Sequence, residues 1–323
     1  MEPLRLAFFG TPDFAVPTLE RLRAGRHPVV VVVSQPDRGR GRGRRRTPSP
    51  VATHALQAGL PLLRPEKVQD AEVVRRLHGF APDLGIVVAF GQFLPRQIRA
   101  LPSRGYLING HASLLPRHRG AAPIPYAILC GDAETGVSVM RVERRMDAGP
   151  VALVRRLDIG PSENAGSLGT RVAELTAEAI ATVVEQVAAD SVSWLEQDEG
   201  AATLAPKITR RDGQLDPRQP AHTLVRRVRA LAPRPGAYLQ VGHEALRVLE
   251  AKATPGSAPD PGLLVCGGDP PLRVATAQGW LCPVSVQRPG GRPLPAAEFL
   301  RGFRLPPGAR ALAPPSEAGE TAA

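Results

Sequence analysis

The chain has 323 residues, of which 43% are hydrophobic and 22% charged, so most of it can fold around buried cores. Basic residues outnumber acidic ones by 41 to 30, and the formal net charge of +11 favours a polyanionic partner over a generic basic surface. Three scattered cysteines form no C-x-x-C pair, which argues against a disulfide framework or a zinc site. Without a secretory signal or an apolar run of roughly 18 residues, we expect a cytoplasmic protein that does not enter a membrane.

The first half of the chain alternates expected strands and helices. Residues 4–9 form an apolar run that Gly10 closes, and residues 29–33 are five valines, β-branched and apolar on both faces like a buried parallel strand. Further strands are expected at 84–89 and 106–108, and helices at 51–58 and 71–77. This alternation predicts an α/β fold with a doubly wound, mostly parallel sheet.

The expected elements change character near residue 190. Two more strands, 135–142 and 151–157, precede a long helix at 167–189 that closes a first domain of residues 1–190. Residues 191–206 lack a strong period and are predicted to be a linker. Short apolar pieces between prolines and glycines then predict a small β-barrel over residues 207–305, with strands at 238–241, 245–249, 263–266, 272–275 and 280–286. We expect residues 306–323 to be a disordered tail.

Two polar side chains follow the buried strand at 106–108. Asn109 and His111 are two residues apart on an extended chain, so they point to the same side of the sheet. Open α/β sheets bind ligands at the carboxyl ends of their strands. Asparagine is an uncharged donor, and histidine exchanges protons near neutral pH. A turn-capping asparagine beside a hydrogen-bonded histidine is the alternative reading of the same pattern.

Asp147 lies in the turn between the expected strands 135–142 and 151–157. Ala148 and Gly149 follow it, and glycine allows a close backbone approach. A carboxylate near His111 would fix the orientation of the imidazole ring. An ordinary turn aspartate explains the residue equally well, and spacing alone does not pair Asp147 with His111.

Six segments in the first domain together resemble the methionyl-tRNA formyltransferase family, in the family's order. They are GTPDF at 10–14, QPDR at 35–38, NGHASLLP at 109–116, RGAAPI at 119–124, GDAETGV at 131–137 and MDAG at 146–149. The resemblance implies a Rossmann-like formyltransferase domain followed by a C-terminal β-barrel of oligonucleotide-binding type. It also implies transfer of the formyl group of 10-formyltetrahydrofolate to the α-amino group of methionyl initiator tRNA, without a metal.

The resemblance assigns roles to individual residues. Asn109, His111 and Asp147 match the family's catalytic trio, which assists transfer through a tetrahedral intermediate. The cofactor-binding residues it implies are Ser113, Leu114, Leu115, Pro116, Val88, Phe90 and Gly91. Ala112 and Phe90 differ from the residues usual in the family, and the trio is intact.

A run of arginines interleaved with glycines follows Asp37. Its members are Arg38, Arg40, Arg42, Arg44, Arg45 and Arg46. A solvated basic loop is the alternative reading, but the resemblance implies that this run contacts the acceptor arm of the tRNA and that Arg42 supplies selectivity for the initiator. Lys207 and Arg210, at the start of the expected barrel, are further candidate tRNA contacts. We expect the enzyme to act as a monomer.

Four other functions fit these motifs less well. A formyltransferase acting on a small amine, or a hydrolase releasing formate from the same folate, would use the same trio but needs neither the arginine run nor a basic second domain. A noncatalytic RNA-binding protein would explain the charge but not the trio. The alternation Gly39-x-Gly41-x-Gly43 lacks the spacing of a dinucleotide or nucleoside triphosphate loop.

Overall fold

The computed structural model of the chain describes residues 2–40, 45–258, 260–303, 305–306 and 308–315, with residues 40 and 45 described in their backbone alone. The chain divides into two compact units. The first unit comprises Met1–Pro123, Glu134–Asp158 and Gly169–Pro206, and the second comprises Ile124–Ala133, Ile159–Leu168 and Lys207–Ala323. Residues 191–206, predicted as a linker, belong to the first unit.

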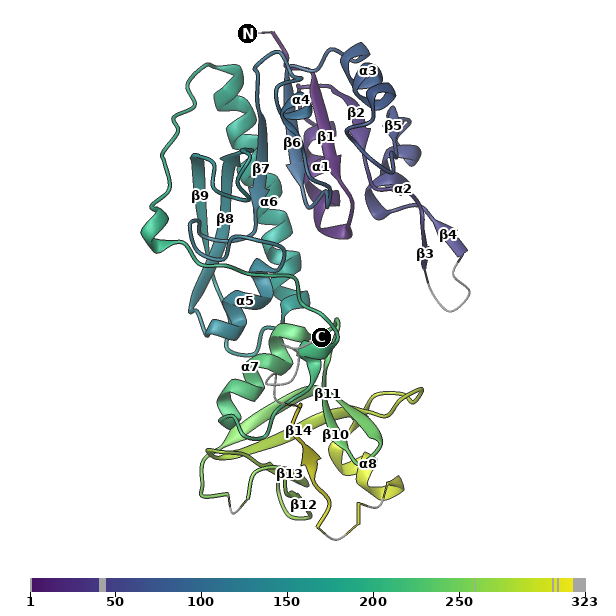
Figure 1. The fold of residues 1–323 in the computed structure, drawn as a ribbon, viewed down its shortest axis with the longest axis vertical. Helices are drawn as coiled ribbons and strands as arrows, with labels where there is room; N and C mark the ends of the chain where they lie inside the picture. The colour runs from purple at the N-terminus through teal and green to yellow at the C-terminus, as the bar shows by residue number, and fades with distance from the viewer. Residues whose placement is uncertain (1, 41–44, 259, 304, 307, 316–323) are drawn as a thin grey trace, which may run out of the picture. The chain divides into compact units, whose positions relative to one another are not determined.

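A seven-stranded sheet forms the centre of the first unit (Figure 1). Its order is β5 (Leu62–Leu63), β2 (Val29–Val33), β1 (Leu6–Gly10), β6 (Leu84–Val88), β7 (Leu107–His111), β8 (Glu134–Arg141) and β9 (Val151–Asp158). The strands from β5 to β7 pair in parallel, whereas β8 and β9 are antiparallel additions beside β7. The predicted doubly wound, mostly parallel sheet is therefore confirmed.

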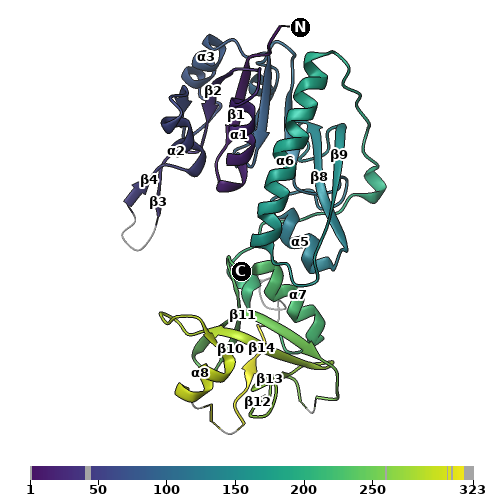
Figure 2. The same cartoon turned by 180° about the vertical axis from the view of Figure 1, so that it is seen from behind.

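Helices cover both faces of this sheet. They are α1 (Val16–Arg23), α2 (Pro50–Gln57), α3 (Ala71–Gly79), α4 (Arg96–Arg99) and, from Gly169 onward, α6 (Ala165–Ala188). The helix α5 (Pro123–Cys130) belongs from Ile124 onward to the second unit. On one face, Phe9, Val31 and Leu107 pack with Leu77 of α3 and Ile98 of α4 in a single buried cluster. The part of α6 from Gly169 onward runs beside β7 on the other face (Figure 2).

The second unit is built on an antiparallel sheet. Its main path is β12 (Leu264–Cys266), β13 (Leu272–Ala275), β14 (Trp280–Gln287), β11 (Glu244–Thr254), β10 (Ala237–Val241) and β16 (Ala311–Leu312), and β15 (Leu294–Pro295) pairs with β14. A bridge between Leu263 and Arg310 joins the two ends of the path, so the sheet is nearly closed, in agreement with the predicted barrel. The helices α7 (Ala221–Leu231) and α8 (Ala296–Gly302) complete the unit.

The residues after 305 differ in part from the predicted disordered tail. Val241 of β10 pairs with Ala311, and Gln240 pairs with Leu312. Ala311 is buried in the core of the second unit, so its small apolar side chain and its backbone hydrogen bonds supply a reason for order there. Residues 316–323 lie outside the described residues. In the part of the chain that is described, no helix is both long and apolar enough to cross a membrane.

Candidate active site

Asn109 and His111 project from the carboxyl end of β7, as their spacing predicts. A Cβ atom on the intervening Gly110 would lie 2.6 Å from Cγ2 of Thr176 on α6, so glycine is needed for this helix to pack on the strand. Because neighbouring strand residues face opposite sides, Asn109 and His111 lie on the face away from α6. His111 is only 6% exposed, and Asn109 is half-buried.

The His111 ring lies between two acceptors. Its Nε2 atom is 2.9 Å from the carbonyl oxygen of His118, which can only accept, so Nε2 carries a hydrogen in this arrangement. Its Nδ1 atom is 3.6 Å from Oδ2 of Asp147. The structure thus brings together the histidine and the aspartate that spacing alone could not pair.

Asp147 is held in a tight turn between β8 and β9. Its Oδ2 atom accepts a hydrogen bond of 2.8 Å from the backbone N–H of Gly120, and its side chain is 14% exposed. Its φ of 51° is left-handed, which costs a non-glycine residue about 1 to 3 kcal/mol. A Cβ on Gly149 would lie 2.0 Å from the carbonyl oxygen of Arg141, so the turn closes only with glycine there.

The loop after His111 is fixed through its backbone. The hydroxyl of Ser138 donates to the carbonyl of Ser113 at 2.8 Å and accepts from the N–H of Leu115 at 3.0 Å. The Leu115–Pro116 peptide is cis, and Leu114 packs so closely on Gly136 that a Cβ there would lie 2.6 Å from Leu114 Cδ2. The four residues 113–116 are therefore presented in one defined conformation beside His111.

The predicted cofactor-binding residues at the end of β6 are mostly buried. Phe90 as a whole is 2% exposed, and its ring packs edge-on against Phe9 at 5.6 Å, so the ring faces the core and offers no surface for stacking. Its carbonyl oxygen accepts hydrogen bonds from Oγ1 of Thr11 at 2.8 Å and from Nε2 of Gln35 at 3.3 Å. Val88 is buried, and Gly91 has a φ of 83° that suits glycine.

Sequence reasoning missed a segment that braces these loops. This bracing segment, residues 195–205, exchanges two backbone hydrogen bonds with Val151 through Leu195, and others with Arg119 through Thr203 and Ala205. Gln197 and Glu199, on the same segment, both contact the side chain of Arg119. The one sequence signal for this segment was Arg119. It lies in an otherwise apolar motif, and a buried arginine needs hydrogen-bond acceptors from elsewhere in the chain.

Glu199 is the acidic member of this network. It accepts from Arg119 at 3.0 Å and from Arg145 at 2.6 Å. Hydrogen bonds from Arg119 and then from Arg145 lower the pKa of Glu199 to about 2. The carboxylate is therefore ionised throughout the neutral range and keeps the arginines in place.

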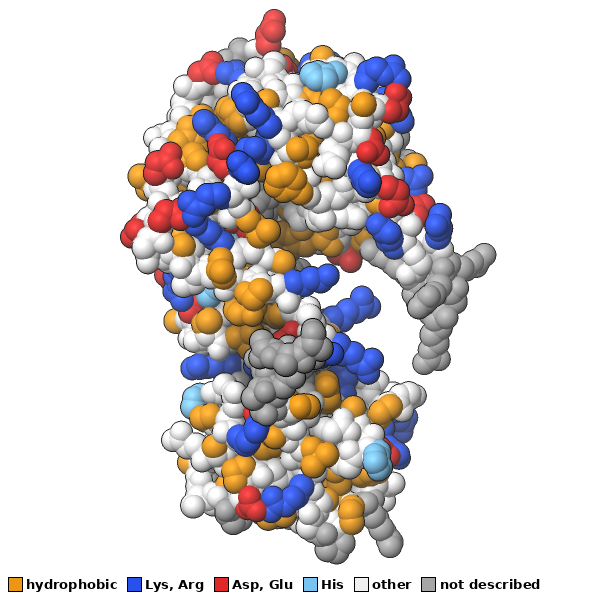
Figure 3. All heavy atoms as spheres, in the orientation of Figure 1, with side chains coloured by type: hydrophobic (Ala, Val, Ile, Leu, Met, Phe, Trp, Pro, Cys, Tyr) orange, Lys and Arg blue, Asp and Glu red, His pale blue; other side chains and the backbone are white. Residues whose placement is uncertain are grey.

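The arginine run forms a hairpin where it is described. Strand β3 (Arg38–Arg40) pairs with β4 (Arg45–Thr47), and Arg38 reaches Glu66 at 3.4 Å while remaining largely exposed. Arg46 is exposed, whereas Arg42 and Arg44 lie outside the described residues. Lys207 and Arg210 are exposed on the second unit. On the face of the first unit shown in Figure 3, basic side chains are interspersed with acidic ones.

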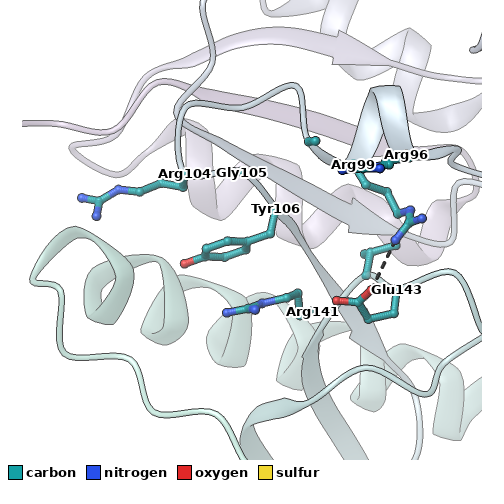
Figure 4. Close-up of a pocket in the computed structure, with 9 residues that line it drawn as sticks. Arg96, Arg99, Arg104, Gly105, Tyr106, Arg141 and Glu143 are labelled. Atoms are coloured by element: carbon teal, nitrogen blue, oxygen red, sulfur yellow. Dashed lines mark hydrogen bonds and ion pairs between the residues drawn. The ribbon is translucent and has the colours of Figure 1, made fainter.

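A cavity of about 480 Å³ lies at the other end of β7, away from all the predicted site residues (Figure 4). It is lined by Arg96, Arg99, Ala100, Arg104, Gly105, Tyr106, Arg141, Val142 and Glu143. Arg141 lies 4.7 Å from the ring centres of both Tyr106 and Trp194, and Arg99 pairs with Glu143 at 3.3 Å. Burial raises the pKa of Tyr106.

Within the described ranges, no group of three or more His, Cys, Asp or Glu side chains could hold a metal ion.

Comparisons with known proteins agree on one family. Residues 4–184 match the family model described as formyl transferase, and residues 207–304 match the formyl transferase C-terminal domain. A methionyl-tRNA formyltransferase of Thermus thermophilus is 41% identical over 95% of this chain and 99% of its own, and one of Halorhodospira halophila is 44% identical over 94% and 98%. The solved structure of HypX from Aquifex aeolicus in complex with tetrahydrofolic acid has a TM-score of 0.60 at 18% identity, covering 93% of this chain and 47% of that one.

Proposed function

Because the chain belongs to the methionyl-tRNA formyltransferase family, we propose that it transfers the formyl group of 10-formyltetrahydrofolate to the α-amino group of methionyl initiator tRNA. The observation that carries this proposal is the approach of His111 to Asp147, at the strand end that also bears Asn109. We further propose that the enzyme acts in the cytoplasm as a monomer.

Asn109, His111 and Asp147 have distinct tasks in this reaction. The folate supplies the activated formyl carbon. The amide of Asn109 donates to the formyl oxygen, where negative charge develops as the amine adds, and Nε2–H of His111 does so in place of its hydrogen bond to the His118 carbonyl. One such donor is worth roughly 3 to 4 kcal/mol. His111 also moves a proton toward the leaving nitrogen, and Asp147 holds the imidazole ring in the orientation that this requires.

The loops on either side of β7 fit a bound folate. Leu114, Leu115 and Pro116 are half-buried and Gly91 is exposed, so these four residues can offer backbone amide groups, whereas Ser113, Val88 and Phe90 are buried. Neutral amide groups of this kind suit the donors and acceptors of a pterin ring. We therefore propose that Leu114, Leu115, Pro116 and Gly91 contact the folate, and that the buried Ser113, Val88 and Phe90 hold these loops in place.

The arginine hairpin and the start of the second unit are the proposed tRNA contacts. Exposed guanidinium groups such as Arg38 and Arg46 can engage phosphates in pairs of hydrogen bonds, and Lys207 and Arg210 add positive charge. We assign the selectivity for the initiator acceptor end to Arg42, because Gly41-Arg42-Gly43 resembles the Gly-Arg-Gly core of the family's tRNA-contacting insertion.

One assay tests the proposal against its rivals. The full chain is incubated with 10-formyltetrahydrofolate and methionyl initiator tRNA, methionyl elongator tRNA or a small primary amine, and formylation and free formate are measured. We expect the initiator tRNA to be formylated much faster than the other two acceptors. Equal formylation of the small amine, or release of formate without an acceptor, would identify one of the alternative enzymes instead.

A further inference from the structure

We propose that Gln197, on the bracing segment, is a positioning residue that holds Asp147 in place for the reaction. The inference rests on the proposed function, because it assigns Gln197 an effect on formyl transfer. Gln197 is 50 positions from Asp147 in the sequence, and its side-chain amide reaches the backbone of the turn that carries this aspartate.

The side-chain amide of Gln197 both donates and accepts hydrogen bonds. Its Nε2 group donates to the carbonyl oxygen of Asp147 at 2.9 Å and to that of Gly149 at 2.7 Å. Its Oε1 atom accepts from Nη2 of Arg119 at 2.7 Å and from Nε at 3.1 Å. Both hydrogens of the amide and its oxygen are therefore engaged, and the side chain fixes the turn to a buried arginine.

Arg119 links Gln197 to the residue that binds the carboxylate of Asp147. Arg119 is 5% exposed and is clamped by Gln197 and Glu199. The next residue, Gly120, donates its backbone N–H to the Asp147 carboxylate. The bracing segment thus fixes Asp147 twice, by its main chain through Gln197 and by its carboxylate through the backbone after Arg119.

A left-handed aspartate needs this support. The φ of 51° at Asp147 is less stable than an ordinary turn conformation, so the turn relaxes if its carbonyl groups lose their donors. Relaxation would change the separation of Asp147 from His111, now 3.6 Å, and with it the orientation of the imidazole ring. A displacement of about 1 Å in such a group costs about a hundredfold in rate.

Gln197→Glu is the variant that separates the two ends of the amide. A glutamate keeps oxygen atoms for Arg119 but has no hydrogen to donate to Asp147 and Gly149. We expect kcat to fall by about tenfold to a hundredfold, with KM for both substrates within about twofold of the parent. Gln97→Glu on α4 is the matched control, since Gln97 makes one exposed hydrogen bond to the carbonyl of Gln69 and should leave kcat unchanged.

A double-mutant cycle shows whether Gln197 acts through Asp147. The rate constant of formyl transfer is measured in an Asp147→Ala background under single-turnover conditions with excess enzyme. In that background, Gln197→Glu should lower the rate constant by less than about a further twofold. The same full loss in that background would overturn the proposal, as would a rise in KM without a fall in kcat. Thermal melting accompanies each variant, and if Gln197→Glu melts below the assay temperature, the shorter amide of Gln197→Asn provides the same test.

The parent chain separates the two hypotheses. If the parent does not formylate methionyl initiator tRNA, the proposed function fails. If the parent is active and folded Gln197→Glu and Gln197→Asn are equally active, only the positioning role is overturned.

Discussion

The two ends of strand β7 differ in how their polar side chains are held. At the carboxyl end, His111 approaches Asp147 on the strand end that also bears Asn109, among tight turns that glycines permit. At the amino end, a cavity of about 480 Å³ is lined by four arginines, of which Arg141 lies over the rings of Tyr106 and Trp194 and Arg99 is paired with Glu143. The cavity is therefore separate from the proposed chemistry, which is located instead by the approach of His111 to Asp147.

The largest difference between the two ends should be seen on removal of the proposed trio. Asn109→Ala, His111→Ala and Asp147→Ala should each lower kcat by at least about a hundredfold, because each removes a group that acts only as charge and protons move. Their losses should not add, and the dissociation constant for tRNA should stay close to that of the parent. Steady-state formylation and filter binding measure the two quantities. Near-normal turnover in any one variant would remove that residue from the mechanism.

Two glycines with positive φ sharpen the comparison. A Cβ on Gly120 would lie 2.6 Å from the carbonyl oxygen of Ala205, whereas one on Gly105, beside the cavity, would have no described atom within 4 Å. Gly120→Ala should therefore lose about 2 kcal/mol more unfolding free energy than Gly105→Ala. It should also lose about tenfold in kcat, because Gly120 donates to Asp147. Chemical denaturation and the formylation assay would show equal effects if the two ends were equivalent.

Arg141→Lys tests the amino end alone. The substitution keeps the positive charge and removes the planar group that lies over the rings of Tyr106 and Trp194. We expect a loss of about 1 kcal/mol in unfolding free energy and a kcat within about twofold of the parent. A large fall in kcat with a normal melting temperature would mean that the cavity contributes to the reaction.

The smallest expected effect is a pH dependence of stability at the carboxyl end. The pKa of Glu199 is lowered from 4.5 to about 2 by Arg119 and Arg145, so ionised Glu199 stabilises the fold above pH 4.5. This contribution is lost as the pH falls from about 4.5 toward 2. The difference in melting temperature between the parent and Glu199→Gln should shrink over that interval. A difference that stays constant there would show that the ion pairs contribute nothing measurable.

The features that sequence could predict are those with a local pattern. Five valines define β2, and the two-residue spacing of Asn109 and His111 places both on one face of β7. The ordered motifs also predicted the family, which the comparisons confirm. The two strand assignments depend on neighbouring residues only, and the family assignment depends on short motifs read in order along the first domain.

The features that sequence could not predict are long-range contacts. The approach of Asp147 to His111 joins two loops, and Gln197 reaches the same turn from residues without a periodic pattern. The burial of the Phe90 ring depends on Phe9, which lies on another strand. Ala311 belongs to a strand only because Val241 is its partner. In each case the decisive partner is far away in the chain, so local propensity carries no signal.

The bracing segment also has a consequence for the order in which the protein is synthesised. Every strand of the first sheet, and Asp147 itself, leaves the ribosome before residues 195–205 do. A nascent chain that stops short of Leu195 therefore holds the complete sheet but lacks Gln197, Thr203 and the backbone that pins Gly120. Because N-terminal domains fold during translation, the trio can reach its final geometry only as a late event, after the sheet beneath it has formed.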